Sequence, residues 1–275
     1  MNRLLRIEWN KLFYNRGTRI FLILYFIMIL AMGLILPNFK QNLNGLQLNF
    51  IELGALNFPT IWHNISWLIG LGKFFLGIIV INNITNEYSF GTFKQNSIDG
   101  LSRLEFFSSK LIMNLIFVIG STLLVFGIVM VIGAQFAETF DFMSGIEFLA
   151  GYFVELFAFI SLVMFLAFLF KKSTFAILSI FILMITELIF VGIESFIGVR
   201  YFPTHYDEWT NVTSFLPLRS NANIIDFPSI SFQSFFTTGK LFKESHVAWE
   251  YFGVNVLYII AFLGLSYLII KKRDL

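Results

Sequence analysis

The sequence predicts an all-α integral membrane protein with six transmembrane helices, and three observations support this fold class. Of the 275 residues, 57% are hydrophobic, 19% are aromatic and only 13% are charged, whereas a soluble domain carries roughly 25% charged residues. The mean hydropathy is +0.78. The apolar residues also gather in runs near 20 residues long, the length that a helix needs to cross roughly 30 Å of hydrocarbon. These observations argue against a soluble globule and against a disordered chain.

Six apolar stretches satisfy this length criterion. Three of them contain no charged residue, and the other three remain long and rich in Leu, Ile and Phe around one or two isolated charges. An ionisable group at the centre of a span costs only about 2.5–3.5 kcal/mol on the insertion scale, so these three are also predicted to cross the membrane. The predicted spans are Ile20–Leu36, Ile61–Ile84, Leu111–Ala134, Phe148–Phe170, Thr174–Val199 and Tyr251–Ile270.

The basic residues predict the orientation of these spans. Thirteen of the 19 Lys and Arg residues lie in the N-terminal segment, the C-terminal tail and the two loops that would share a side with them. Basic loops are retained in the cytoplasm, so both termini of this multi-pass protein of the cell (inner) membrane are predicted to be cytoplasmic. The bases form no stripe suited to nucleic acid. The chain has no Cys, which excludes disulfides, thiolate metal sites and cysteine nucleophiles.

The chain is predicted to form a single transmembrane domain, residues 1–275, with peripheral segments at its start and near its end. Residues 1–19 read as an amphipathic helix lying on the cytoplasmic face, because Leu5, Trp9 and Leu12 follow helical spacing. The alternative is that the basic residues of this segment only mark the cytoplasmic side and that no helix forms. Residues 200–250 form a long, aromatic outer loop that either caps the spans or places its aromatic rings at headgroup depth.

The loop between the second and third predicted spans, residues 86–110, is the most informative segment. Neighbouring spans need only a handful of connecting residues, whereas this loop has about 25, lacks Pro and contains two short stretches compatible with helix. Asp99-Gly100 separates the stretches, and Ser102 with Glu105 predicts a capping box at the start of the second. The loop is therefore predicted to form a helix–turn–helix elbow, which suits transmission of force from a soluble partner.

This elbow resembles the equivalent loop of type-2 ABC transporter permeases. The matching residues are Glu87-x-x-x-Gly91-Thr92, then Ser102-Arg103, Phe106 and Lys110 at the head of the third span. The layout of six spans with both ends inside is similar to the layout of that family. The N-terminus is also similar to the N-terminus of that family's chains. Its matching residues are Ile7-Glu8-x-x-Lys11-Leu12, followed by Arg16.

The resemblance implies a dimer of two permease chains, identical or paralogous, joined to two cytoplasmic ABC ATPase subunits. ATP and Mg²⁺ would bind to those partners, so this chain is expected to be no enzyme and to hold no cofactor. In agreement, its sequence contains no G-x-x-x-x-G-K-[ST] phosphate-binding loop. The implied function is export of an unidentified substrate, driven by ATP hydrolysis on a separate subunit.

In this interpretation the elbow is a coupling helix that sits in a groove of the ATPase. The resemblance makes Gly91 and Thr92 part of the coupling site, and Gly91 either permits a close approach or a tight bend or is a plain turn residue. The contacts expected with the ATPase are apolar ones from Tyr88, Phe93 and Phe106 and polar ones from Glu87, Arg103 and Lys110.

Ionisable residues inside the predicted spans are candidates for a translocation path, and pairing within the protein is the competing explanation. A rise of 1.5 Å per residue places Lys73 and Glu187 at similar depths, about 18 Å from the outer ends of their spans. The sequence therefore predicts a Lys73–Glu187 pair, within a protomer or across the dimer seam. Glu155 lies about 10 Å deep by the same count and has no evident partner. Glu194 is the fourth such residue.

Functions of other classes stay open on the sequence alone. A secondary transporter driven by an ion gradient would use Lys73 and the buried glutamates as a relay, although the chain lacks inverted halves. A membrane immunity or anchor protein that does not transport would use the outer loop as its recognition surface. An intramembrane enzyme is disfavoured because His63, His205 and His246 do not follow metal-binding helical spacing.

Overall fold

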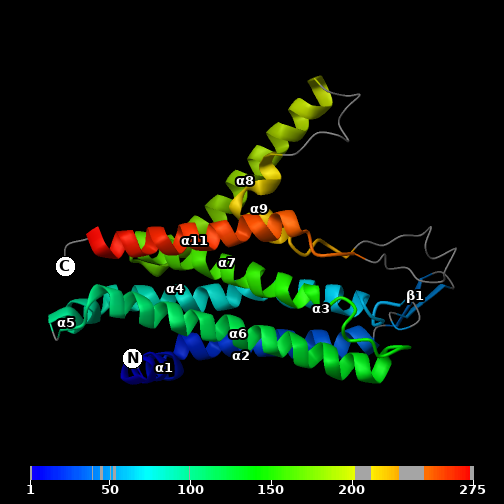
Figure 1. Cartoon of the computed structure of the whole chain (residues 1–275), viewed down its shortest axis with the longest axis horizontal. Coiled ribbons are helices and arrows are strands. Elements are labelled where there is room, and N and C mark those ends of the chain that lie inside the picture. The colour runs from blue at the N-terminus through cyan, green and yellow to red at the C-terminus, as the bar shows by residue number, and fades with distance from the viewer. Residues whose placement is uncertain are drawn as a thin grey trace.

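The computed structural model of the chain is a bundle of helices from which one long helix leans away (Figure 1). It describes residues 2–38, 40–43, 46–49, 51, 54–98, 100–201, 212–228 and 245–272. The helices are α1 (Asn2–Tyr14), α2 (Arg16–Asn38), α3 (Thr60–Gly70), α4 (Lys73–Ser89), α5 (Thr92–Ile98), α6 (Arg103–Phe136), α7 (Glu147–Phe170), α8 (Ser173–Tyr201), the 3₁₀ helix η2 (Val212–Phe215), α9 (Pro217–Ala222) and α11 (Trp249–Lys272).

The structure confirms that the chain is a helical protein with several helices suited to a membrane. By length and composition, five segments are long and apolar enough to cross a bilayer, namely α3 with α4, α6, α7, α8 and α11. A sixth results when the bent pair of α1 and α2 counts as one span. All six predicted spans therefore coincide with helices.

The second predicted span is not one straight helix, because residues 71 and 72 interrupt it between α3 and α4. A Cβ atom at Gly72 would lie 2.4 Å from Cε of Met28 and 2.8 Å from Cε2 of Tyr25, both on α2. A side chain at position 72 would force Met28 and Tyr25 to shift, since such distances are far shorter than real contacts. The interruption thus allows α2 to pack closely on the middle of the span.

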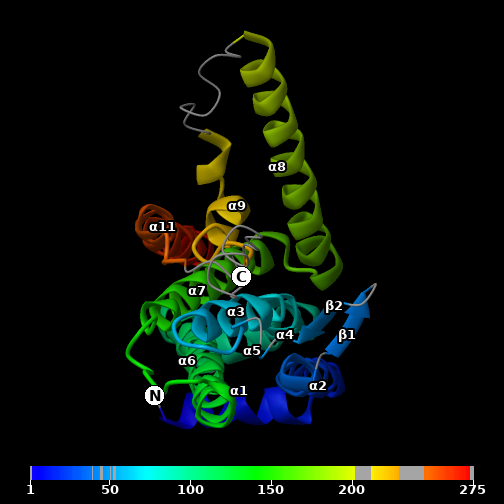
Figure 2. The ribbon, with the colours of Figure 1, turned by 90° about the vertical axis from the view of Figure 1, so that its right-hand side faces the viewer.

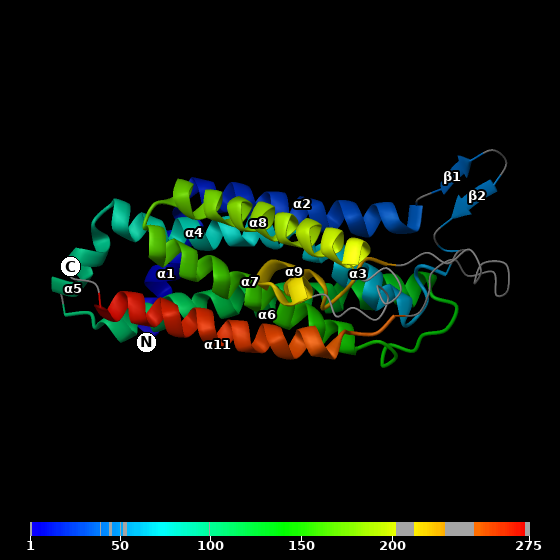
Figure 3. The ribbon, with the colours of Figure 1, turned by 90° about the horizontal axis from the view of Figure 1, so that it is seen from above.

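Helix α7 lies at the centre of the bundle and is largely buried, with α3, α4, α6 and α11 around it (Figure 2). Both described ends of the chain lie at the same end of the bundle as α5, which we call the α5 end (Figure 1). The hairpin of β1 (Lys40–Leu43) and β2 (Leu46–Asn49) marks the opposite β1 end (Figure 3). This antiparallel pair was not predicted from the sequence.

A cluster of hydroxyl groups joins three helices inside the bundle. The Tyr152 hydroxyl of α7 lies 2.6 Å from Oγ of Ser121 on α6, and the Tyr25 hydroxyl of α2 hydrogen-bonds to the same Ser121 oxygen. All three side chains are buried. Their mutual hydrogen bonds satisfy polar groups that would otherwise be costly in an apolar interior, and they fix the relative positions of the helices.

At its start the chain forms the predicted helix, and α1 meets α2 at a bend of 78°. Asn15 lies in the bend, where its Oδ1 accepts a hydrogen bond from the backbone N–H of Thr18 and so caps α2. The predicted apolar stripe is divided, since Leu12 is buried against the bundle whereas Trp9 and Phe13 are exposed. One face of α1 therefore binds the protein, and an aromatic face remains outside.

The predicted elbow differs from the structure in one respect. Its first stretch is the short helix α5, and the capping box of Ser102 and Glu105 is present. The second stretch is not a separate helix, however, because α6 runs without a break from Arg103 to Phe136. Asp99 lies outside the described residues, as do residues 202–211 and 229–244 of the predicted 200–250 loop.

Candidate functional site

Four charged side chains and one amide meet inside the α5 end, and we call them the Lys110 cluster: Glu8, Lys11, Asn83, Glu87 and Lys110. Nζ of Lys110 lies 2.6 Å from Oε2 of Glu8 and 2.9 Å from Oε1 of Glu87. It also donates to Oδ1 of Asn83 at 3.1 Å. Lys11 lies 2.7 Å from the same Glu87 oxygen. The cluster therefore binds α1, α4 and α6 together.

Helical spacing brings these residues to one point. Asn83 and Glu87 are four residues apart on α4, and Glu8 and Lys11 are three apart on α1, so each pair shares a helix face. Lys110 projects between both pairs from the second turn of α6 and is 0% exposed. Two carboxylates balance two ammonium groups, so the cluster carries no net charge, as a stable buried ionic group requires.

The Lys110 cluster also fixes the start of α5. The Thr92 hydroxyl donates a hydrogen bond to Oε2 of Glu87, and this joins the first residue of α5 to the cluster. Gly91 between them has φ of +67°, and a Cβ atom there would meet nothing within 4 Å. Within this chain, the glycine thus serves its left-handed backbone conformation and not a close approach.

The three aromatic residues expected to contact a partner pack against one another within the chain. The ring centroid of Phe93 on α5 lies 5.4 Å from that of Tyr88 and 4.7 Å from that of Phe106. Phe106 is buried, and its ring also faces Phe168 of α7. Nζ of Lys171 lies 5.5 Å from the Tyr88 ring centroid, a cation–π contact. These residues hold α5 against the bundle.

The apolar residues that do point outward at the α5 end were missed by the sequence analysis. Phe90, Ile98 and Leu104 are 76%, 84% and 57% exposed. Phe90 precedes α5, Ile98 is its last residue and Leu104 follows it. All three lie in the 86–110 loop, outside the predicted spans, where lipid does not cover apolar side chains. This position could have identified them from the sequence. Arg103 lies beside them and donates a hydrogen bond to the Lys271 carbonyl at the end of α11.

A second polar group, the Lys73 cluster, consists of Lys73, Glu155, Ser220, Asn221 and Asn255. Nζ of Lys73 at the start of α4 lies 2.6 Å from Oε1 of Glu155 on α7 and 2.7 Å from Oδ1 of Asn221 on α9. Nδ2 of Asn221 donates to the Glu155 carbonyl at 2.7 Å. Nδ2 of Asn255 on α11 donates to Oγ of Ser220 at 2.9 Å. Four helices therefore meet here.

The prediction of a Lys73–Glu187 pair within the protomer is wrong. Lys73 pairs with Glu155, the residue for which no partner was evident. The depth count treated the spans as straight and parallel, but α8 leans away from the bundle beyond its first turns (Figure 1). The Glu187 carboxylate of α8 therefore does not reach Lys73 of α4. The short helix α9 lies between the two residues and contacts both of them.

Glu187 and Glu194 of α8 both bind the segment that returns along that helix. Glu187 accepts hydrogen bonds from the backbone N–H groups of Leu218 and Arg219, at 3.0 and 2.8 Å, in the first turn of α9. Glu194, seven residues later on the same face, accepts from the N–H groups of Val212 and Thr213 at the start of η2. Each carboxylate thus satisfies N–H groups that a helix start leaves free.

The described residues contain no group of three His, Cys, Asp or Glu side chains placed to hold a metal ion. Comparison of the chain with models of known protein families and with curated proteins found no match.

Proposed function

We propose that this chain is the membrane subunit of an ATP-driven transporter, and that α5 receives the movement of a separate ATPase. The observation that carries the proposal is the mounting of α5. A short helix lies outside the spans, and the Lys110 cluster ties it to α1, α4 and α6. Its last residue, Ile98, and Phe90, just before the helix, are exposed and apolar. An exposed apolar patch of this kind is typical of a protein interface.

The rigid mounting explains how a force on α5 would reach the spans. Thr92 contacts Glu87, and Glu87 contacts Lys110, so a displacement of α5 acts on α4 and α6 together. Lys110 is fully buried, and its contribution to coupling therefore acts through the cluster and not through direct contact with the ATPase. In this proposal the ATPase contacts are Phe90, Ile98, Leu104 and Arg103.

Two further parts of the proposal follow from the resemblance to type-2 ABC permeases. The transporter contains a second permease chain, and the α5 end faces the cytoplasm. Lys73 and Glu155 lie within the bundle between spans, where a change in tilt would separate or join them. We place them, with Glu187 and Glu194, beside the translocation path.

The test is co-purification of the ATPase with the full-length chain from cells that express both. We expect Ile98→Asp to lower the amount of bound ATPase at least about tenfold, because a charge would replace an apolar contact at the centre of the interface. Ile146→Asp changes an exposed isoleucine at the β1 end and serves as the matched control.

Equal ATPase recovery with both variants would remove α5 as the docking element.

A transporter driven by an ion gradient is the competing function, favoured by the buried Lys73–Glu155 pair. It predicts substrate flux in vesicles without any ATPase, and loss of that flux in Lys73→Met. ATP-dependent flux that persists after the gradient is collapsed would exclude it.

A further inference from the structure

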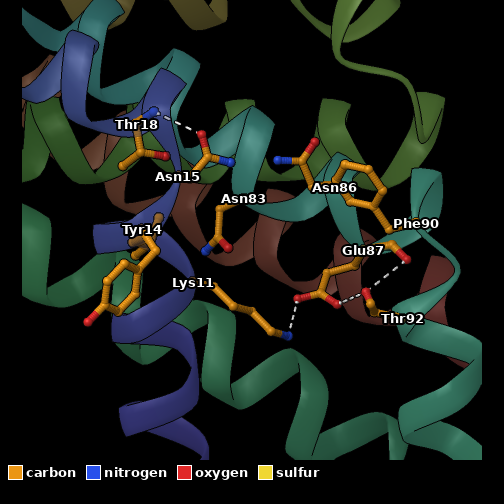
Figure 4. A pocket seen from close by; sticks show the side chains of 10 residues that line it. Lys11, Tyr14, Asn15, Thr18, Asn83, Asn86, Glu87, Phe90 and Thr92 are labelled. Carbon is orange, nitrogen blue, oxygen red and sulfur yellow. Dashed lines mark hydrogen bonds and ion pairs between the residues drawn. The ribbon is translucent and has the colours of Figure 1, made fainter.

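A pocket of about 320 Å³ lies in the corner between α1 and α2, where α4 and the start of α5 close it. The size is sufficient for a small polar ligand or a lipid headgroup. Its polar walls come from two sides, with Lys11, Asn15 and Thr18 on the α1–α2 corner and Asn83 and Asn86 on α4 (Figure 4). Phe90 and Thr92 also line it, so the pocket adjoins the outward surface of α5 at Phe90.

The position of the pocket corresponds to the headgroup layer of a membrane. The 78° bend sets α1 across the direction of α2, so α1 lies along the bilayer surface when α2 spans it. Trp9 and Phe13 of α1 are exposed, as expected for aromatic side chains at the membrane–water boundary. This step depends on α2 spanning the bilayer and does not rest on the proposed ATPase.

The polar groups that face the pocket are mainly hydrogen-bond donors. Oδ1 of Asn15 accepts from Thr18, and Oδ1 of Asn83 accepts from Lys110, which leaves the amide nitrogens of both residues for other partners. In Figure 4 the nitrogen ends of Asn15 and Asn86 point toward one another across the pocket. Among the described residues, no acceptor binds these nitrogens, so a ligand with acceptor oxygens fits between them.

The charges at the pocket favour an anion with a single negative charge. The ammonium group of Lys11 lines the pocket, and Arg16 and Arg19 are exposed at the same corner. The Glu87 carboxylate is also part of the wall, but Lys11, Lys110 and Thr92 already bind its oxygens. Near neutral pH, inorganic phosphate carries between one and two negative charges, whereas a phosphodiester carries one and is repelled less by Glu87.

We propose that this corner pocket binds the phosphodiester headgroup of a membrane phospholipid. The phosphate oxygens accept hydrogen bonds from the amide nitrogens of Asn15 and Asn86 and from Lys11. Leu12 and Phe90, which also line the pocket, contact the apolar part of the headgroup region. A bound lipid would thereby join the α1–α2 corner to the start of α5.

The test uses the full-length chain in detergent and native mass spectrometry to measure retained phospholipid. Asn86→Asp replaces a donor with a negative charge, and Asn15→Asp does so while keeping the cap on Thr18, since Asp is an equally good N-cap. We expect each variant to lose phosphatidylglycerol at least about tenfold more readily than the unchanged chain, because a charge-assisted hydrogen bond is replaced by repulsion. Asn82→Asp, one residue from the pocket, is the control.

Lipid addition gives a second readout that separates the sources of the phosphate group. After delipidation, phosphatidylglycerol in micelles is expected to raise the unfolding temperature of the unchanged chain and of Asn82→Asp, but not that of Asn86→Asp or Asn15→Asp. Inorganic phosphate is expected to have no such effect. An equal rise with inorganic phosphate would identify a soluble anion as the ligand, and equal lipid retention in all four chains would overturn the proposed site.

Discussion

Lys110 determines the packing of the α5 end, because it contacts residues from two other helices and is completely enclosed. Its ammonium group lies within 2.9 Å of carboxylate oxygens from both Glu8 and Glu87. Removing one member of a buried ionic group leaves its partners unpaired, and this costs more than the group contributes to stability while intact. The residue is therefore needed for the fold of this end, whatever binds there.

We expect Lys110→Met to lower the free energy of unfolding by about 3–5 kcal/mol, because Glu8 and Glu87 would remain buried with one fewer counter-charge. Thermal unfolding in detergent measures the effect. Lys110→Met combined with Glu8→Gln should recover part of the loss, since it removes one of the uncompensated charges.

Lys172→Met is the control for this experiment, because Lys172 is an exposed lysine and its loss leaves no buried charge. If Lys110→Met and Lys172→Met unfold at the same temperature, the Lys110 cluster does not stabilise the chain as described.

Among the elements, the η2–α9 segment depends on carboxylates that belong to another helix. A helix of six residues such as α9 has little stability of its own, since helix nucleation is unfavourable. Glu187 and Glu194 supply the missing partners at the starts of α9 and η2. On the side of α8, the segment therefore depends on both carboxylates, which lie on one face of that helix.

The absence of Cys from the chain makes this dependence measurable. Ser214→Cys places the only thiol of the chain on η2, at a buried position. Adding Glu194→Gln is expected to increase the maleimide labelling rate of this thiol at least about tenfold, because hydrogen bonds to a charged acceptor contribute about 1.5–3 kcal/mol each.

Glu250→Gln removes an exposed carboxylate near the start of α11 and should leave the labelling rate of Ser214→Cys unchanged. Unchanged labelling in Glu194→Gln as well would mean that this carboxylate does not hold η2.

Helix positions could be predicted from the sequence, whereas helix contacts could not. Runs of apolar residues predict where a helix lies, and Ser102 with Glu105 predicted where α6 begins, since both signals are local. The partner of Lys73 depends on the tilt of α8 and on the insertion of α9, which are set by packing over the whole bundle. The close approach of α2 at Gly72 likewise depends on tertiary packing, and Glu87 and Lys110 face each other because of how α4 and α6 are rotated.

At the scale of the whole molecule, the structure places α5 and both described ends of the chain at one end of the bundle (Figure 1). The excess of Lys and Arg on this side predicts that it faces the cytoplasm. Two exposed positions test the orientation, namely Gln95 on α5 and Thr139 beyond the end of α6.

In intact cells, a membrane-impermeant maleimide is expected to label Thr139→Cys and to leave Gln95→Cys unlabelled until the membrane is opened. The lack of other thiols makes the unchanged chain the blank for both measurements. Labelling of Gln95→Cys from outside would show that the α5 end faces away from the cytoplasm. This result would also exclude docking of a cytoplasmic ATPase on α5.

The position of α9 has a mechanical consequence for the bundle. On one side its backbone is held by Glu187 of α8, and on the other its Asn221 reaches Lys73, Glu155 and Asn255 on three different spans. The short helix α9 therefore connects α8 to the rest of the bundle. A movement of α8 would therefore either break the hydrogen bonds between α9 and Glu187 or displace α4, α7 and α11 with it. Which contact of α9 is weaker would determine whether these helices move separately or together.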